Sequence, residues 1–430
     1  MKDLDAARRG GVPPGSQGAG LRCSQNLPLS REDEALAAEP EAGDGGNIAN
    51  EAVTHPKTPT TGADLTPSFL TGVLQAAGCL AAGRVEHVAL EPLERSGFAS
   101  DLLRLRPRYL GGEGPETLIA KLPPAAESVR QVVAAFGFFA REVRFFRELS
   151  ARVPVRTPRC YFGQLDEGGA LGALLFEDLG ALSLGAGEAD DESRGLERVR
   201  RGIDALACLH VAFWDDESVR QLPWIAADIA QRHAGAATLF HARTESFRQL
   251  VGDRAPADFL ARLDDVADFI AHQGQRCAAP HSTLLHGDYR LDNLLFPETG
   301  APVMIDWQLT GFGPGSYDLA YFIAQSLSPE TRRVRQVALL DRYHAALIAG
   351  GVEGYSREAL QLDYRRSLLS CSLIVVNLSG TVLENRLRAE GAGPEAAAAA
   401  EMLPGLEALF ATMTERTLQA IMDEDALGLL

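Results

Sequence analysis

Two segments, LLHGDYRLDNLLF at residues 284–296 and PVMIDWQLTGFGPGSYDLAYFIA at residues 302–324, decide the fold of this chain. Each contains a short apolar run, at residues 294–296 and at residues 303–305, and proline and glycine residues separate the two runs. Short apolar runs bounded by turn residues favour β-strands. We therefore predict that the two runs pair as a hairpin.

Polar residues stand at the adjacent ends of this hairpin. Asn293 precedes the first predicted strand, and Asp306 follows the second. Amide and carboxylate oxygens suit a hard cation such as Mg²⁺, which takes a few protein ligands together with substrate phosphate oxygens. Asp288, on the preceding loop, is close enough in sequence to face the same ion and free to accept a proton from a hydroxyl. In kinase-type phosphoryl transfer, one Asp likewise accepts the hydroxyl proton, while an Asn and a second Asp hold the metal.

The triplet His286-Gly287-Asp288 has a simpler interpretation when it is taken alone. Gly-Asp is ordinary turn chemistry, and His286 can be a buried histidine whose hydrogen bonds are satisfied. The complete pattern is more specific, because an amide follows the triplet at Asn293 and a carboxylate follows the second apolar run at Asp306. The joint pattern favours a phosphotransfer site.

The quoted stretch resembles the superfamily of aminoglycoside phosphotransferases and choline kinases, and residues 305–327 are most similar to its ecdysteroid-kinase-like branch. The resemblance implies that Asp288 is the catalytic base. It also implies that Asn293 and Asp306 are metal ligands. Asp318 would then be a buried brace for the catalytic loop.

Three strand-like stretches in the first half of the chain, at residues 85–93, 100–106 and 117–121, predict an antiparallel sheet. The turn between the first two contains Ser96 and Gly97, whose backbone N–H groups and small hydroxyl can cradle phosphate. An ordinary hairpin turn is the alternative.

Lys121 ends the third strand, where a kinase needs a lysine for the α- and β-phosphates. A helix predicted over residues 129–149 follows and carries Glu142, which can orient this lysine. Glu148 lies on the same helix, but Glu142 is preferred because aromatic and apolar residues surround it and because the pattern of the resembled family fits around it. A solvated helix carboxylate is the alternative for Glu142.

An apolar strand ending in an acidic turn is predicted at residues 171–179, LGALLFEDL. The resemblance implies that this is the hinge, where backbone groups around Glu177 and Leu179 pair with the adenine edge. A buried strand with a polar cap is the alternative. Specificity for the acceptor would come from the later helical segments, at residues 215–280, 357–379 and 394–426.

These elements predict an α+β, bilobal protein-kinase-like fold, with a small antiparallel sheet lobe and a larger, mostly helical lobe. We assign residues 63–180 to the N-terminal nucleotide-binding lobe and residues 181–430 to the C-terminal catalytic and substrate lobe. Residues 1–62 are rich in Gly, Pro, Ala and acidic residues and poor in aromatic residues. Such a composition predicts a disordered leader.

Composition restricts the partners. The 430 residues are 46% hydrophobic and 23% charged, which is enough for a substantial core, and the formal net charge of −17 disfavours nucleic acid. An acidic surface suits a cationic substrate, although solubility alone explains it. The sequence carries no feature that predicts an oligomeric state.

The six cysteines include no CxxC pair, so the sequence indicates neither a zinc site nor a disulfide framework, and we expect reduced thiols. The N-terminal residues lack the apolar core of a signal peptide, and no unbroken apolar run predicts a membrane span. We therefore expect a cytoplasmic protein with no membrane partner.

The predicted function is transfer of the γ-phosphoryl group from ATP, with Mg, to a hydroxyl of a small molecule. Asp288 would act as base, and Lys121 with the metal would neutralise phosphate charge. One alternative is a nucleotide-binding pseudokinase or scaffold without turnover. A second is a metal-dependent hydrolase that uses His286, Asp288 and Asp306.

Overall fold

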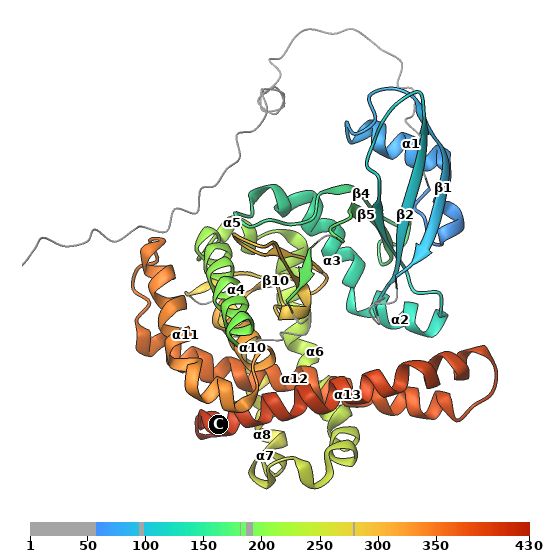
Figure 1. The fold of residues 1–430 in the computed structure, drawn as a ribbon. Coiled ribbons are helices and arrows are strands. Elements are labelled where there is room, and N and C mark those ends of the chain that lie inside the picture. The colour runs from blue at the N-terminus through green and yellow to red at the C-terminus, as the bar shows by residue number, and fades with distance from the viewer. Residues whose placement is uncertain (1–56, 94–98, 181, 186–191, 278–279) are drawn as a thin grey trace, which may run out of the picture. The chain divides into compact units, whose positions relative to one another are not determined.

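The computed structural model describes residues 57–93, 99–180, 182–185, 192–277 and 280–430. A five-stranded sheet with its helices precedes a larger, mostly helical part (Figure 1). The predicted α+β architecture with a small sheet lobe and a helical lobe is therefore confirmed. Most of the predicted leader, residues 1–56, and the turn at Ser96 and Gly97 lie outside the described residues.

The sheet of the first lobe is antiparallel and has the order β1-β2-β3-β5-β4. Its helix α1 (Pro67–Ala76) begins at Thr66, whose side chain accepts the Phe69 N–H, and buries Leu70, Val73 and Leu74. These three side chains pack on one face of the sheet. The strands are β1 (Arg84–Pro92), β2 (Asp101–Leu110), β3 (Leu118–Leu122), β4 (Cys160–Leu165) and β5 (Gly172–Glu177).

The single helix predicted over residues 129–149 is wrong, because three helical segments occupy this region. Gly137 ends α2 (Glu127–Phe136) with φ of 65° and begins α3 (Phe138–Arg144). Glycine adopts this left-handed conformation without the steric cost that a Cβ brings. A π-helical turn at Phe145–Leu149 follows α3.

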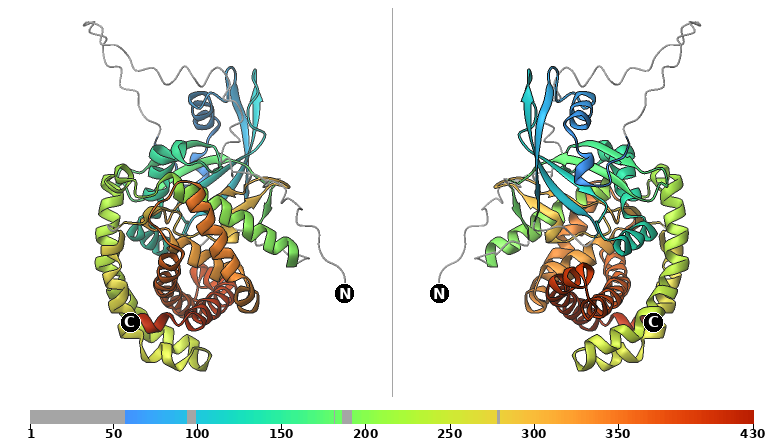
Figure 2. Two further views of the ribbon diagram at one scale, coloured as in Figure 1. Left: turned by 90° about the vertical axis from the view of Figure 1, so that its left-hand side faces the viewer. Right: turned by 90° about the vertical axis from the view of Figure 1, so that its right-hand side faces the viewer.

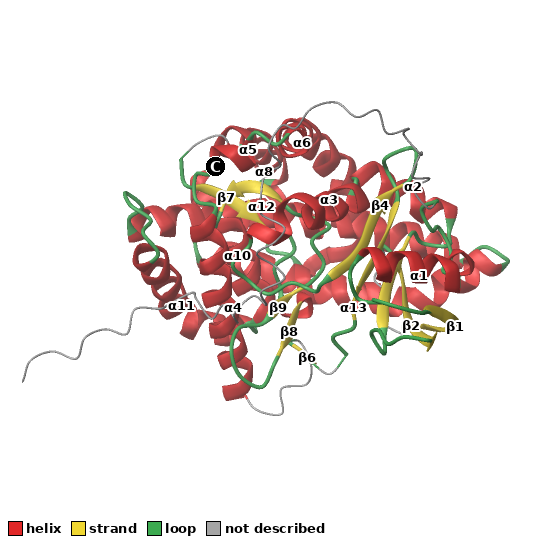
Figure 3. Cartoon of the chain, turned by 90° about the horizontal axis from the view of Figure 1, so that it is seen from above, coloured by secondary structure: helices red, strands yellow, loops and turns green. Residues whose placement is uncertain are grey.

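The predicted hairpin is present. Strand β8 (Leu294–Phe296) pairs antiparallel with β9 (Val303–Met304), and β6 (Ser183–Leu184) adds a third strand. A second small sheet pairs β7 (Ser282–Leu285) with β10 (Gly311–Pro314). Figure 3 shows these short strands among the helices, apart from the strands of the large sheet.

Helix α10 (Ser316–Ser326) is buried along nearly its whole length and packs on α12 (Arg357–Ala389), α13 (Pro394–Asp423) and α4 (Glu192–Ala212). Figure 2 shows α11 (Pro329–Ala349), α12 and α13, in orange and red, lying together. The remaining helices are α5 (Glu217–Arg220), α6 (Pro223–Val251), α7 (Ala257–Ala261), α8 (Leu263–His272) and α9 (Gly274–Cys277).

Among the described helices, α12 is long and apolar enough to cross a membrane by length and composition alone. Its most apolar window has a mean hydropathy of 1.5, and 56% of that window is buried inside the protein. Core helices of soluble proteins meet the same criteria, so one such helix is weak evidence for a membrane span.

Four of the described cysteines, Cys79, Cys160, Cys277 and Cys371, are free thiols, which agrees with the expectation of reduced thiols at these positions.

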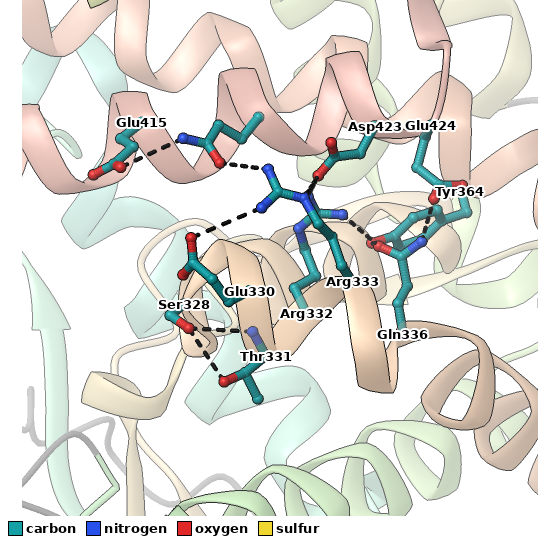
Figure 4. Close-up of polar contacts among 11 residues, drawn as sticks. Ser328, Glu330, Thr331, Arg332, Arg333, Gln336, Tyr364, Glu415, Asp423 and Glu424 are labelled. Atoms are coloured by element: carbon teal, nitrogen blue, oxygen red, sulfur yellow. Dashed lines mark hydrogen bonds and ion pairs between the residues drawn. The ribbon is translucent and has the colours of Figure 1, made fainter.

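A polar cluster joins the C-terminal end of α13 to α11 and α12 (Figure 4). The buried Arg332 guanidinium pairs with the Asp423 carboxylate and donates to Gln336 Oε1 at 2.9 Å. Arg333 pairs with the same Asp423 carboxylate at 2.8 Å, and Tyr364 donates its hydroxyl to Gln336. The cluster therefore fixes α13 against its two neighbours.

The two arginines of this cluster give a matched test of burial. Arg332→Met removes a guanidinium that is 1% exposed, and we expect it to lower the free energy of unfolding by about 2 kcal/mol. Arg333 is 44% exposed, so Arg333→Met should cost less than about 1 kcal/mol. Urea unfolding measures both, and equal losses would contradict the burial argument.

Candidate active site

The loop after β7 is held by a carboxylate of α10. The backbone N–H groups of His286 and Gly287 donate to the two oxygens of Asp318, at 2.7 and 3.0 Å, and the Asp318 side chain is fully buried. Gly287 has φ of 85°, and a Cβ at this position would lie 2.1 Å from the Leu309 carbonyl oxygen. Glycine is therefore required here, and Asp318 braces the loop as the resemblance implied.

His286 is a buried structural residue. Its Nε2 lies 2.9 Å from the Ile305 carbonyl oxygen, and its Nδ1 accepts the Asp288 N–H at 3.4 Å. The ring also packs against Trp307. Both ring nitrogens contact the backbone. His286 is therefore a buried histidine whose hydrogen bonds are satisfied, the simpler of the two interpretations of the triplet.

Asp288 and Asn293 lie at the two ends of one short loop. Asn293 donates its amide to Asp288 Oδ2 and to the Asp288 carbonyl oxygen, both at 2.9 Å. The Ile305 N–H donates to the Asn293 carbonyl oxygen, which ties the loop to the hairpin beside Asp306. The three predicted polar residues are therefore brought together by the hairpin.

Lys121 joins the two lobes. Its Nζ lies 2.6 Å from Glu142 Oε2 and 2.8 Å from Asp306 Oδ1, and the lysine and glutamate side chains are 8% and 2% exposed. Burial opposes the positive charge, but the two carboxylates outweigh it and raise the pKa of Lys121. The ammonium therefore stays charged between its partners.

Glu142, and not Glu148, is the glutamate that contacts Lys121. Glu142 meets Lys121 in a buried position, which excludes a solvated carboxylate, and burial raises the pKa of Glu142 although Lys121 opposes this. Glu148 instead accepts the indole N–H of Trp224 on α6 at 2.9 Å.

Asp306 has the unusual backbone φ of 66°. Residues in this left-handed region need support from their surroundings. The next residue, Trp307, supplies it: the indole is buried, donates to the Met304 carbonyl oxygen and stacks on Phe145 at a centroid distance of 3.9 Å. The strained backbone lies where the Asp306 carboxylate meets Lys121.

Of the two predicted hinge residues, Glu177 is the last residue of β5 and Leu179 follows the strand. The Glu177 N–H donates to the Arg159 carbonyl oxygen, and its side chain pairs with Arg156 at 3.0 Å. The Leu179 carbonyl oxygen accepts the Leu182 N–H. These contacts occupy the Glu177 N–H and accept one hydrogen bond at the Leu179 carbonyl oxygen, and the roles of Glu177 and Leu179 stay predictions.

Arg104 makes a contact at the predicted hinge that the sequence did not indicate. Its guanidinium donates from β2 to Asp178 at 2.6 Å, and the Gly180 N–H donates to the same carboxylate. Although burial acts in the other direction, these hydrogen bonds hold the pKa of Asp178 below its usual value. The pair links residues 74 positions apart, and no local motif marks it.

The donor chemistry fits Mg²⁺ only together with substrate oxygens. Within the described residues, no group of three or more His, Cys, Asp or Glu side chains could hold a metal ion. Asp306, Asn293 and Asp288 instead offer two carboxylates and one amide. Mg²⁺ commonly binds one or two carboxylates and completes its shell with waters and phosphates.

Removing the Lys121 charge should destabilise the protein, because the buried Glu142 carboxylate would lose its cation. Lys121→Met leaves Glu142 buried without its cation, and we expect the free energy of unfolding to fall by about 3–5 kcal/mol. The double variant Lys121→Met/Glu142→Gln removes that charge and should recover part of the loss. Urea unfolding tests both, and a double variant no more stable than the single one would refute this account.

Similar proteins are found at low identity. An uncharacterized kinase-like protein of Caenorhabditis elegans is 26% identical over 220 residues, which cover 48% of this chain and 55% of that protein. A choline kinase of Cryptosporidium parvum is similar in structure, with a TM-score of 0.46 and 9% identity over 85% of this chain and 98% of that one. A macrolide 2′-phosphotransferase of Brachybacterium faecium has a TM-score of 0.41 and 17% identity, over 78% and 97%.

The family model described as the phosphotransferase enzyme family matches residues 103–360. This range is more than half of the chain and contains Lys121, Glu142 and the complete loop and hairpin. The predicted membership of a phosphotransferase superfamily is confirmed, whereas the likeness to the ecdysteroid-kinase-like branch stays a prediction. The chain belongs to the phosphotransferase enzyme family.

Proposed function

We propose that the protein transfers the γ-phosphoryl group of ATP, with Mg²⁺, to a hydroxyl of a small organic molecule. The observation that carries this proposal is the buried Lys121 bridge to Glu142 and Asp306. The bridge brings a cation for phosphate from the sheet lobe to the hairpin that carries the candidate metal ligands. Phosphoryl transfer depends mainly on such positioning and charge neutralisation.

In this reaction the acceptor oxygen forms a bond to the γ-phosphorus, and the bond from that phosphorus to the β–γ bridging oxygen breaks, so ADP leaves. Asp288 orients the hydroxyl and takes its proton. Lys121 balances charge on the α- and β-phosphates while Glu142 holds its ammonium in place. When bound, Mg²⁺ would neutralise phosphate charge, and Asn293 with Asp306 would hold it.

The two alternatives are less well supported. A pseudokinase or scaffold would not require Lys121, Asp288, Asn293 and Asp306 to be present together. A metal-dependent hydrolase using His286 would need a ring nitrogen as ligand, but both nitrogens of His286 contact the backbone. The acceptor itself is proposed only as a small-molecule alcohol, for which cationic and bulky neutral compounds are both candidates.

Nucleotide binding and turnover test this function separately. We expect ATP with Mg²⁺ to raise the Tm of the wild type, because a ligand that binds the native state stabilises it. Asp306→Ala should lose most of this shift, since it removes a metal ligand. Asp288→Ala should keep the shift and lose about 100-fold or more in ADP formation with a panel of hydroxyl compounds.

Asp204→Ala is the control, because this carboxylate pairs with Arg342 between α4 and α11 and is not among the proposed site residues. It should leave both readouts unchanged. Equal ADP formation in the wild type, Asp288→Ala and Asp306→Ala would overturn the proposed reaction. A metal-driven hydrolysis without any nucleotide-dependent shift would favour the hydrolase.

A further inference from the structure

The Asp318 carboxylate, which holds the catalytic loop, is also contacted by a buried histidine. His210 lies in the last turn of α4, and its Nε2 is 3.4 Å from Asp318 Oδ2. Its Nδ1 lies 2.6 Å from the hydroxyl oxygen of Tyr343 on α11. Asp318 Oδ2 is the oxygen that also accepts the His286 N–H. The His210 ring therefore connects α11 to the carboxylate that holds the loop.

The chemistry of these three groups assigns the protons of the contact. An ionised carboxylate only accepts hydrogen bonds, and a neutral imidazole has one N–H and one acceptor nitrogen. Burial, with further contributions from Tyr355 and Asp318, raises the pKa of Tyr343 well above its usual value, so the phenol keeps its proton. Tyr343 therefore donates to Nδ1 of His210, and the ring carries its own proton on Nε2, facing Asp318.

The contact between His210 and Tyr343 is tightly enclosed. The side chains of His210, Asp318 and Tyr343 are fully buried. A Cβ on Gly315, the residue before α10, would lie 2.9 Å from both His210 Nδ1 and the Tyr343 hydroxyl oxygen. The Thr283 hydroxyl donates to the His210 carbonyl oxygen at 2.9 Å and ties the end of α4 to β7. Water therefore has little room to replace a partner that is removed.

The two contacts of the His210 ring are unequal. The 2.6 Å contact to Tyr343 is short for a hydrogen bond, whereas the 3.4 Å contact to Asp318 is longer than usual. The orientation of the ring is therefore fixed mainly by Tyr343. Because Asp318 receives the Nε2 proton only while the ring keeps this orientation, the contact to Asp318 depends on Tyr343.

We propose that Tyr343 is a positioning residue for the transfer reaction, because it holds His210 against the carboxylate that fixes the catalytic loop. A hydrogen bond to a charged carboxylate is stronger than a neutral one and helps to keep Asp318 in one orientation. The loop backbone that donates to Asp318, and with it Asp288, then keeps its place. This inference rests on the proposed function, in which Asp288 orients the acceptor hydroxyl. Tyr343 lies 133 positions from His210, so no local motif marks the pair.

The kinetic test compares two buried tyrosines that each lose one hydroxyl. Tyr343→Phe should lower kcat for ADP formation from MgATP by about 10-fold, because a misplaced Asp288 loses transition-state stabilisation, and should change the KM for ATP less. Tyr364→Phe, which removes a hydrogen bond to Gln336 in the α11–α12–α13 cluster, should leave kcat unchanged. In an Asp288→Ala background, adding Tyr343→Phe should have no further effect on the rate. An unchanged kcat in Tyr343→Phe, or a full additional loss in that background, would overturn the proposal.

Amide hydrogen exchange tests the same arrangement without turnover. The His286 and Gly287 N–H groups should exchange about 10-fold faster in Tyr343→Phe than in the wild type, because a displaced Asp318 carboxylate protects them less. Tyr364→Phe should leave both rates unchanged, and the N–H groups of β3 should exchange equally in all three proteins, which excludes a general loss of stability. Equal exchange at the loop in the wild type and Tyr343→Phe would overturn the role of Tyr343. If exchange quickens while the wild type neither binds nor turns over ATP, Tyr343 still positions the loop and the proposed function fails.

Discussion

The site depends on one buried charge, the Lys121 ammonium between Glu142 and Asp306. A buried lysine is costly unless it is paired, and here each carboxylate comes from a different element. Glu142 belongs to a helix beside the sheet, whereas Asp306 follows the hairpin of the helical lobe. The same pairing that compensates Lys121 therefore fixes the position of β3, which carries this lysine, relative to the candidate metal ligands.

The loop and hairpin part of the site depends on two residues whose backbone φ is positive. Gly287 approaches the Leu309 carbonyl oxygen too closely for any side chain, and Asp306 is turned by its left-handed backbone. Each is held by a buried neighbour, the Asp318 carboxylate in the first case and the Trp307 indole in the second. The surrounding core thus supports both of these backbone conformations at the site.

The sequence predicted the parts of the site whose signals are local. The hairpin, Asp288, Asn293 and Asp306 lie within a short stretch, so turn residues and apolar runs were enough to place them together. The break at Gly137 was missed because a helical apolar pattern continues across it. The Arg104 contact to Asp178 was missed for a different reason: it joins residues 74 positions apart, and side-chain pairing at that range leaves no spacing rule in the sequence.

Helix α6 of the helical lobe contacts the helix that carries Glu142, so the position of Glu142 depends on contacts with both lobes. Arg141, next to Glu142, pairs with Asp228 at 2.7 Å, and Glu148 accepts the indole N–H of Trp224. Both partners lie on α6, so α3 and the π-helical turn after it are held on either side of Glu142. A shift of α6 would therefore move Glu142 relative to Lys121. Because Lys121 also holds Asp306, such a shift would reach the hairpin that carries the candidate metal ligands.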